Sequence, residues 1–108
     1  MTQISDRLEK VAIQLKANIY FDGGVVSYSL FSEEGKKKTI GLIRQGEYHF
    51  NTEAPEQMDI ISGVCRVKLA GEKDWKMFSA QQSFKVPGKS SFDIAVDSGF
   101  AEYLCIFL

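Results

Sequence analysis

The chain has 108 residues, of which 44% are hydrophobic and 12% aromatic, a composition that predicts one folded domain and argues against disorder. Its 13 basic and 14 acidic residues give a net charge of −1, without the basic excess expected of a nucleic-acid-binding protein. The start of the chain is too charged for a signal peptide, and no apolar run approaches the roughly 20 residues of a membrane helix. We therefore expect a cytoplasmic protein that binds neither nucleic acid nor membrane.

Residues 1–17 carry the weakest structural signal. Their apolar positions fit one face of a helix and one face of a strand equally well, so periodicity does not separate the two. We expect a loose or helical start and a strand from about Val11.

The next segment predicts strands around tight turns. Residues 18–22 are rich in aromatics and end in a turn at Gly23–Gly24. Strands are expected at residues 25–32 and 39–44, joined by a charged hairpin loop that contains one glycine. Lys37–Lys38 is expected to be the solvated rim of the second strand rather than a binding patch.

The stretch from Gly46 to Gly63 predicts a strand, a turn at Pro55 and a second strand. Polar and aromatic residues alternate in the first of these strands, which places them on opposite faces. The polar face carries Glu47, His49 and Asn51, and the aromatic face carries Tyr48 and Phe50. A face with a carboxylate, an imidazole and an amide is either solvated or the lining of a site.

The rest of the chain continues the β pattern. Residues 65–69 and 92–96 alternate between apolar and other side chains, and Pro87–Gly88 marks a sharp turn. From Tyr103 onward the chain is apolar on both faces, which indicates a strand that is covered on both sides. In a small all-β chain we interpret the second covered face as a subunit contact, most simply in a two-fold dimer.

About nine short strands without a long helix predict an all-β single domain, an antiparallel sandwich or barrel. The two cysteines, Cys65 and Cys105, lie in apolar runs and do not have the spacing of a zinc site. We expect both to be buried, reduced thiols that pack as small hydrophobic residues.

Three short motifs resemble those of the cupin family of small β-barrels. Glu56 and Gly63 have the spacing of that family's first conserved stretch. His49 and Asn51 fall where the family places a His-x-His pair, and Pro87–Gly88 falls at its second conserved turn.

A longer pattern resembles one cupin family in particular, the pyrimidine/purine nucleoside phosphorylase family. The pattern comprises Asn18-x-Tyr20-Phe21-x-Gly23-Gly24, Gly46-Glu47-Tyr48-x-Phe50, Pro55-Glu56-x-Met58, Ser62-Gly63, Trp75, Phe84-x-Val86-Pro87-Gly88-x-Ser90-x-Phe92 and Tyr103-Leu104-Cys105. It implies a cupin β-barrel or jelly roll over residues 18–108. Residues 1–17 are then an N-terminal extension that contains the first strand.

This resemblance implies a cytosolic homodimer whose partners are a nucleoside and phosphate. Such an enzyme cleaves purine and pyrimidine nucleosides with broad specificity, giving a free base and α-D-ribose 1-phosphate. Phosphorolysis passes through an oxocarbenium-like state, so it needs cationic or N–H donors for phosphate, a carboxylate or amide near the ribose, and an aromatic surface for the base.

We select the site residues from this chemistry. Glu56 is the best catalytic candidate, because the cupin register points it into the barrel, and Glu47 and His49 are further catalytic candidates. The candidates for substrate binding are Arg44, Asn51, Arg66, Lys89 and Tyr48. Among these, the two arginines and Lys89 are the expected phosphate ligands.

We expect no metal and no cofactor other than phosphate as co-substrate. Metal-binding cupins generally use three histidines and a glutamate, whereas this chain has one histidine. Asn51 and Phe92 stand at the other two histidine positions, so only His49 and Glu56 remain as ligand types. Two alternatives stay open: a non-catalytic, metal-free cupin that binds a small sugar or nucleotide, and a metal-dependent oxygenase or isomerase, against which the missing histidines argue.

Overall fold

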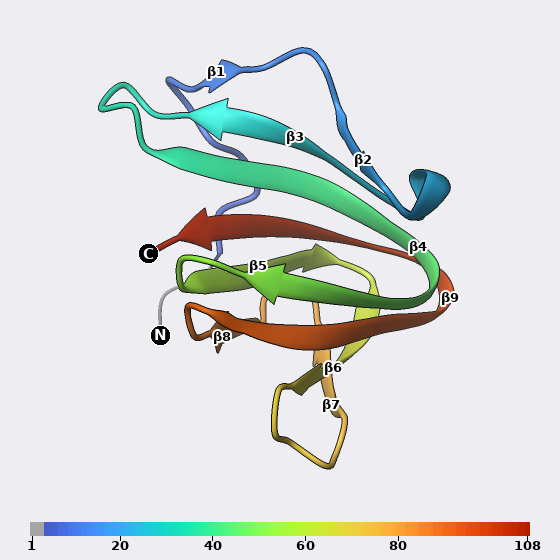
Figure 1. Ribbon diagram of the computed structural model, residues 1–108. Helices are drawn as coiled ribbons and strands as arrows, with labels where there is room; N and C mark the ends of the chain where they lie inside the picture. Colours follow the sequence, from blue (N-terminus) through green and yellow to red (C-terminus); the bar gives the residue numbers. More distant parts are fainter. Residues whose placement is uncertain (1–3) are drawn as a thin grey trace.

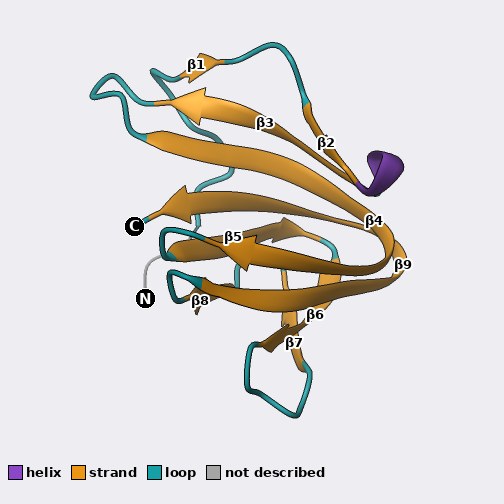
Figure 2. Cartoon of the chain, viewed as in Figure 1, coloured by secondary structure: helices purple, strands orange, loops and turns teal. Residues whose placement is uncertain are grey.

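The structure is a computed structural model that describes residues 4–108. These residues form nine β-strands and one short 3₁₀-helix, with no α-helix, which confirms the predicted all-β class (Figure 2). The elements are β1 (Ala12–Ile13), β2 (Asn18–Tyr20), η1 (Phe21–Gly23), β3 (Val25–Phe31), β4 (Lys37–Thr52), β5 (Glu56–Ser62), β6 (Val64–Leu69), β7 (Lys76–Ser79), β8 (Ser83–Val86) and β9 (Ser90–Phe107). Within the described part of the chain, no helix has the length and apolarity needed to span a membrane.

Two long strands, β4 and β9, organise the molecule. They pair antiparallel along most of their lengths, and both curve round at the same end of the molecule (Figure 1). The pairing register shifts between Arg44 and Gly46, where a β-bulge bends β4. The two strands expected at residues 39–44 and after Gly46 are therefore one bent strand.

The bend lets β4 and β9 contribute to two layers. One layer contains β1, β2, β3, the first half of β4, the second half of β9, β5 and β8. The other layer contains the second half of β4, the first half of β9, β6 and β7. The hydrophobic core lies between the layers and includes Val25, Ile43, Ile60, Cys65, Val67, Val86 and Ile94. This is the predicted jelly-roll sandwich.

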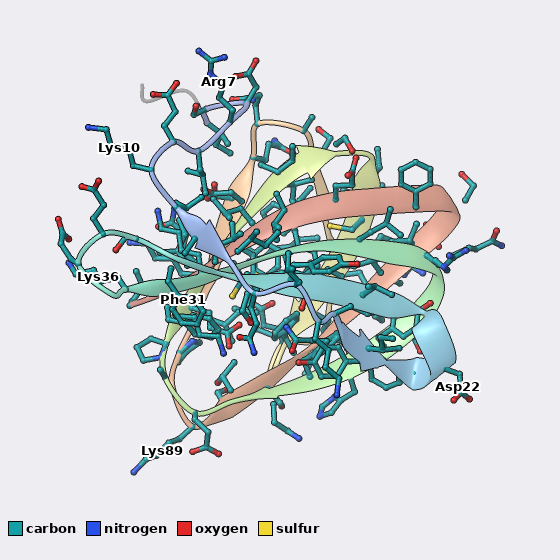
Figure 3. All side chains as sticks on the ribbon, turned by 90° about the horizontal axis from the view of Figure 1, so that it is seen from above. Arg7, Lys10, Asp22, Phe31, Lys36 and Lys89 are labelled. Atoms are coloured by element: carbon teal, nitrogen blue, oxygen red, sulfur yellow. The ribbon has the colours of Figure 1, made fainter. Side chains whose placement is uncertain are left out.

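Alternation along the end of β9 separates an inward from an outward set of side chains. Tyr103 and Cys105 are buried in the core, whereas Leu104 and Ile106 line a cleft of about 530 Å³ on the outer side of the sheet. Residues 4–8 line the same cleft from the opposite side. The chain's own N-terminal segment, which carries Arg7 in Figure 3, therefore lies over part of the face that the sequence assigned to a subunit contact.

Candidate active site

A cavity of about 270 Å³ lies inside the barrel, between the two layers. Its polar lining includes Asn18, Lys37, Thr39, Asn51, Glu56 and Cys105. Its aromatic lining consists of Tyr20, Phe50, Phe92, Tyr103 and Phe107. A concave site with a largely apolar wall and a few polar groups is typical of small-molecule binding, and this volume lies just below the range of roughly 300–1,000 Å³ for such pockets.

Glu56 is the acidic residue of the cavity. It begins β5 directly after Pro55, and strand alternation places it on the same side as the buried Met58 and Ile60. Its Oε1 accepts a hydrogen bond from the thiol of Cys105, with 3.4 Å between the sulfur and the oxygen. Burial raises the pKa of Glu56, and the hydrogen bond from Cys105 opposes this rise. No salt bridge to Glu56 is formed within residues 4–108.

Lys37 supplies a positive charge at the mouth of the cavity. It shares the inner side of β4 with Thr39 and Ile43. Among the lining residues in the described part of the chain, Lys37 is the one Lys or Arg. Its Nζ lies 5.6 Å from the centre of the Phe107 ring, a cation–π contact. Both Lys37 and Lys38 were expected at a solvated rim, but Lys37 lines the cavity and Lys38 lines the outer cleft.

An aromatic surface forms one wall of the cavity. Phe50 of β4 packs edge-on against Tyr20, with ring centres 5.9 Å apart, and stacks on Phe92 of β9 at 5.7 Å. Phe21 of η1 adds a second edge-on contact to Phe50. Tyr20 keeps 45% of its surface exposed. Planar ligands stack on surfaces of this kind.

His49 and Arg66, two of the predicted site residues, lie on the outer surface of the barrel. His49 Nδ1 is 2.7 Å from Asp93 Oδ1, and both side chains are partly exposed. Arg66 donates to both carboxylate oxygens of Asp97, and this pairing lowers the pKa of Asp97. The Arg66 guanidinium also lies over the ring of Trp75, 4.6 Å from its centre. Neither residue lines the cavity.

The remaining predicted residues are also outside the cavity, apart from Asn51. Glu47 and Arg44 are exposed, and Lys89 points away from the ribbon at the tip of its turn (Figure 3). Tyr48 braces the bulge, since its hydroxyl lies 3.1 Å from the carbonyl oxygens of both Arg44 and Gln45. Of the eight predicted residues, the structure brings only Glu56 and Asn51 together in the cavity.

His49 and Glu56 are the two residues of a metal-ligand type at the cupin ligand positions, and they do not lie together. Glu56 lines the cavity, whereas His49 is on the outer face beside Asp93. Within residues 4–108, no group of three or more His, Cys, Asp or Glu side chains is arranged to hold a metal ion. The usual cupin metal-ligand set is therefore not assembled here.

Several cavity residues escaped the sequence analysis, although signals for some of them existed. Asn18 and Tyr20 belong to the family-like pattern, and Asn18 Nδ2 donates to the buried Ser27 and Ser29 hydroxyls. Lys37 and Thr39 share the parity of the apolar Ile43. Alternation along β4 could have placed Lys37 and Thr39 in the cavity, but Lys37 was predicted to be a solvated rim and Thr39 the start of a strand.

The class that this structure defines is that of the jelly-roll barrels, the fold that cupins share, here with a ligand-sized cavity between the layers. A cupin superfamily protein from Desulfitobacterium hafniense has the same fold, with a TM-score of 0.64 at 14% identity, covering 87% of this chain and 83% of that one. A protein of unknown function from an Acinetobacter species is much more similar, with a TM-score of 0.93 and 40% identity over 96% of this chain and all of that one.

Sequence comparison narrows the class to one family. A family model described as pyrimidine/purine nucleoside phosphorylase matches residues 15–107. Proteins of that name from Thiobacillus denitrificans and an Azoarcus species are 48% and 45% identical, covering 94% and 96% of this chain and 97% of each relative. The chain belongs to the pyrimidine/purine nucleoside phosphorylase family, which confirms the resemblance seen in its motifs.

Proposed function

We propose that the protein is a broad-specificity nucleoside phosphorylase, a pentosyltransferase that converts purine and pyrimidine nucleosides and phosphate to free base and α-D-ribose 1-phosphate. One observation carries this proposal: the chain matches relatives named pyrimidine/purine nucleoside phosphorylase at up to 48% identity over 97% of their length. The cavity supports it, because it combines a carboxylate, a cation and an aromatic wall.

The carboxylate, the cation and the aromatic wall each serve a different part of the reaction. An oxygen of phosphate forms a bond to C1′ of the ribose while the bond from C1′ to the base nitrogen breaks. The electron pair of the broken bond leaves with the base nitrogen, which then takes up a proton. Positive charge develops on C1′ and the ring oxygen as the bonds exchange, so a nearby carboxylate stabilises the transition state.

Glu56 is our assignment for that carboxylate, because it is the acidic side chain of the cavity. Lys37 is our assignment for the phosphate ligand, since its ammonium group at the mouth can bind an anion while the rest of the substrate extends inward. Asn51 and Asn18 offer amide groups to the ribose hydroxyls. Lys37 replaces the phosphate ligands that were expected from the sequence, because those residues, Arg44, Arg66 and Lys89, lie outside the cavity.

The aromatic wall is our assignment for base recognition. Tyr20, Phe50 and Phe92 present ring faces and edges along one side of the cavity. Stacking discriminates little between bases, because every base has a π-face. A site that holds the base mainly by stacking would therefore accept both purines and pyrimidines.

We further propose that the enzyme works as a cytoplasmic homodimer without a metal. Transfer of a ribosyl group to phosphate needs charge stabilisation but no redox step or metal-bound water. The apolar outward side chains of the first layer support a subunit contact. They include Ile40, which keeps 39% of its surface exposed.

The test is to incubate metal-stripped protein with inosine or uridine, with and without phosphate, and to follow free base by chromatography. We expect base release from both nucleosides only when phosphate is present. Release without phosphate would show a hydrolase and overturn the proposal. No release from folded protein would favour the metal-free cupin that only binds a sugar or nucleotide, and activity that returns only with added metal would contradict the metal-free assignment.

A further inference from the structure

Cys105 occupies a central position in the cavity wall. In β9 it pairs with Thr39 of β4 on one side and with Met58 of β5 on the other, so it lies between the two strands that carry Lys37 and Glu56. Its side chain is 4% exposed and lines the cavity. The expectation that Cys105 packs only as a small hydrophobic residue is therefore incomplete.

The thiol of Cys105 is oriented as a hydrogen-bond donor to the carboxylate of Glu56. The two atoms are 3.4 Å apart, although the residues are 49 positions apart in the sequence. Burial, aided by the neighbouring Glu56 carboxylate, raises the pKa of Cys105, so the sulfur keeps its proton at neutral pH. This is the one side-chain hydrogen bond to Glu56 found within residues 4–108.

We propose that Cys105 is a positioning residue for Glu56: its S–H holds Oε1 in one orientation in the cavity and favours the ionised carboxylate that stabilises the ribosyl cation. This inference deepens the proposed function and rests on it. A buried carboxylate with no cationic partner tends to take up a proton, and a protonated Glu56 would lose the negative charge that the reaction needs. One donor in the wall, placed before substrate binds, counteracts that tendency.

Other titratable groups lie near Glu56 and must stay constant in a test. Lys37 of β4, Tyr103 of β9 and Tyr20 of β2 line the same cavity. On β8, Lys85 pairs with Gln57, which is adjacent to Glu56 in β5 and on the opposite face of the sheet. None of these residues is changed by a substitution at Cys105, so a shift in the titration of Glu56 reports on the thiol.

The experiment compares three variants. Cys105→Val removes the donor but fills its space, so that water does not replace the thiol. Cys105→Ser keeps a donor and makes it a stronger hydroxyl. Cys65→Ala is the control, because Cys65 is the other buried thiol and lies in the core without lining the cavity.

The main readout is the titration of the Glu56 carboxyl carbon by carbon-13 NMR, assigned by its disappearance in Glu56→Gln. We expect the midpoint to rise by about half a unit to one unit in Cys105→Val. It should fall or stay in Cys105→Ser and remain unchanged in Cys65→Ala. An unchanged midpoint in Cys105→Val, or an equal rise in both Cys105 variants, would overturn the proposal.

The second readout is the pH profile of phosphorolysis. The acidic limb of kcat/KM should move to higher pH in Cys105→Val, by the same amount as the NMR midpoint, and return toward wild type in Cys105→Ser. A shifted midpoint with an unmoved acidic limb would overturn the catalytic part of the inference. Absence of phosphorolysis in wild type would overturn the proposed function instead, and the titration would still decide whether Cys105 controls Glu56.

Discussion

The inner and outer faces of the barrel both carry polar residues, but their charges are arranged differently. On the outer face, His49 lies beside Asp93, and Arg66 forms a bidentate pair with Asp97. In the cavity, Glu56 is partly buried without a salt bridge in the described part of the chain. Paired charges in water are satisfied and contribute little to stability, whereas an unpaired charge in a cavity is available to a ligand. A charge that is both unpaired and partly buried therefore marks the site here better than residue type does.

The largest effect is expected from Glu56→Gln, which removes the charge and keeps the shape. If Glu56 stabilises the ribosyl cation, kcat should fall about 10²–10³-fold, as when a group that stabilises transition-state charge is lost. Steady-state phosphorolysis of inosine measures this. A variant with full kcat would remove Glu56 from the proposed chemistry without touching the family assignment.

The same substitution should stabilise the fold at neutral pH. Because the pKa of Glu56 is raised in the folded protein, the folded state holds its proton more tightly than the unfolded state does. The stability linked to this group is fully present below the ordinary glutamate pKa and is lost as pH rises through the raised value. Glu56→Gln should therefore raise Tm at pH 7 and change it little near pH 4. A larger rise in Tm at pH 4 than at pH 7 would contradict the raised pKa of Glu56.

The next largest effect is a loss of stability expected from Gly41→Ala, because the cavity wall has no space for a side chain at this position. Gly41 of β4 faces the ring of Tyr103, and a Cβ added there would lie 2.6 Å from the ring atoms. Tyr103 is buried, so the ring has little room to move, and Gly41→Ala should cost about 1–3 kcal/mol of unfolding free energy, measured by urea denaturation. Adding Tyr103→Leu should recover part of that cost, and strictly additive losses would show that the two residues do not clash.

A smaller effect is expected at Lys37, whose neighbour provides a matched control. Lys37→Met keeps the length of the side chain but removes its charge, so KM for phosphate should rise about 10-fold, equivalent to about 1.4 kcal/mol. Lys38→Met should leave KM for phosphate unchanged, since Lys38 lines the outer cleft. Equal effects in the two variants would mean that Lys37 acts only through the general charge of the surface.

The fold was predictable from the sequence because its signals are local. Alternation and turn residues placed most strands, and the family-like motifs supplied the jelly roll, including the inward position of Glu56. The bulge after Arg44 was not predictable, because it depends on the pairing of β4 with β9 and on support from the Tyr48 hydroxyl. The run from Tyr103 was predicted to be covered on both sides, but only Tyr103, Leu104 and Cys105 are buried, whereas Phe107 and Leu108 are exposed. Its inner face is the cavity wall.

The candidate site was harder to predict, because it depends on which face of a strand is inside. Glu47 and His49 carry suitable chemistry and share the strand parity of Asn51, yet only Asn51, near the end of β4, lines the cavity. The contact between Cys105 and Glu56 joins residues 49 positions apart, so only the tertiary structure reveals it.

The smallest effects are expected from substitutions on the outer face. They test whether the paired charges of that face are dispensable for catalysis. His49→Ala should leave kcat and both KM values within about two-fold of wild type, because His49 contacts Asp93 and does not line the cavity. The partly exposed pair with Asp93 is worth at most about 1 kcal/mol, so the urea midpoint should move only slightly. Asp93→Asn is the matched variant, since it loses the same pair from the other strand. A large loss of kcat in both variants, with little loss of stability, would mean that the outer pair takes part in catalysis and that pairing does not mark the inactive face.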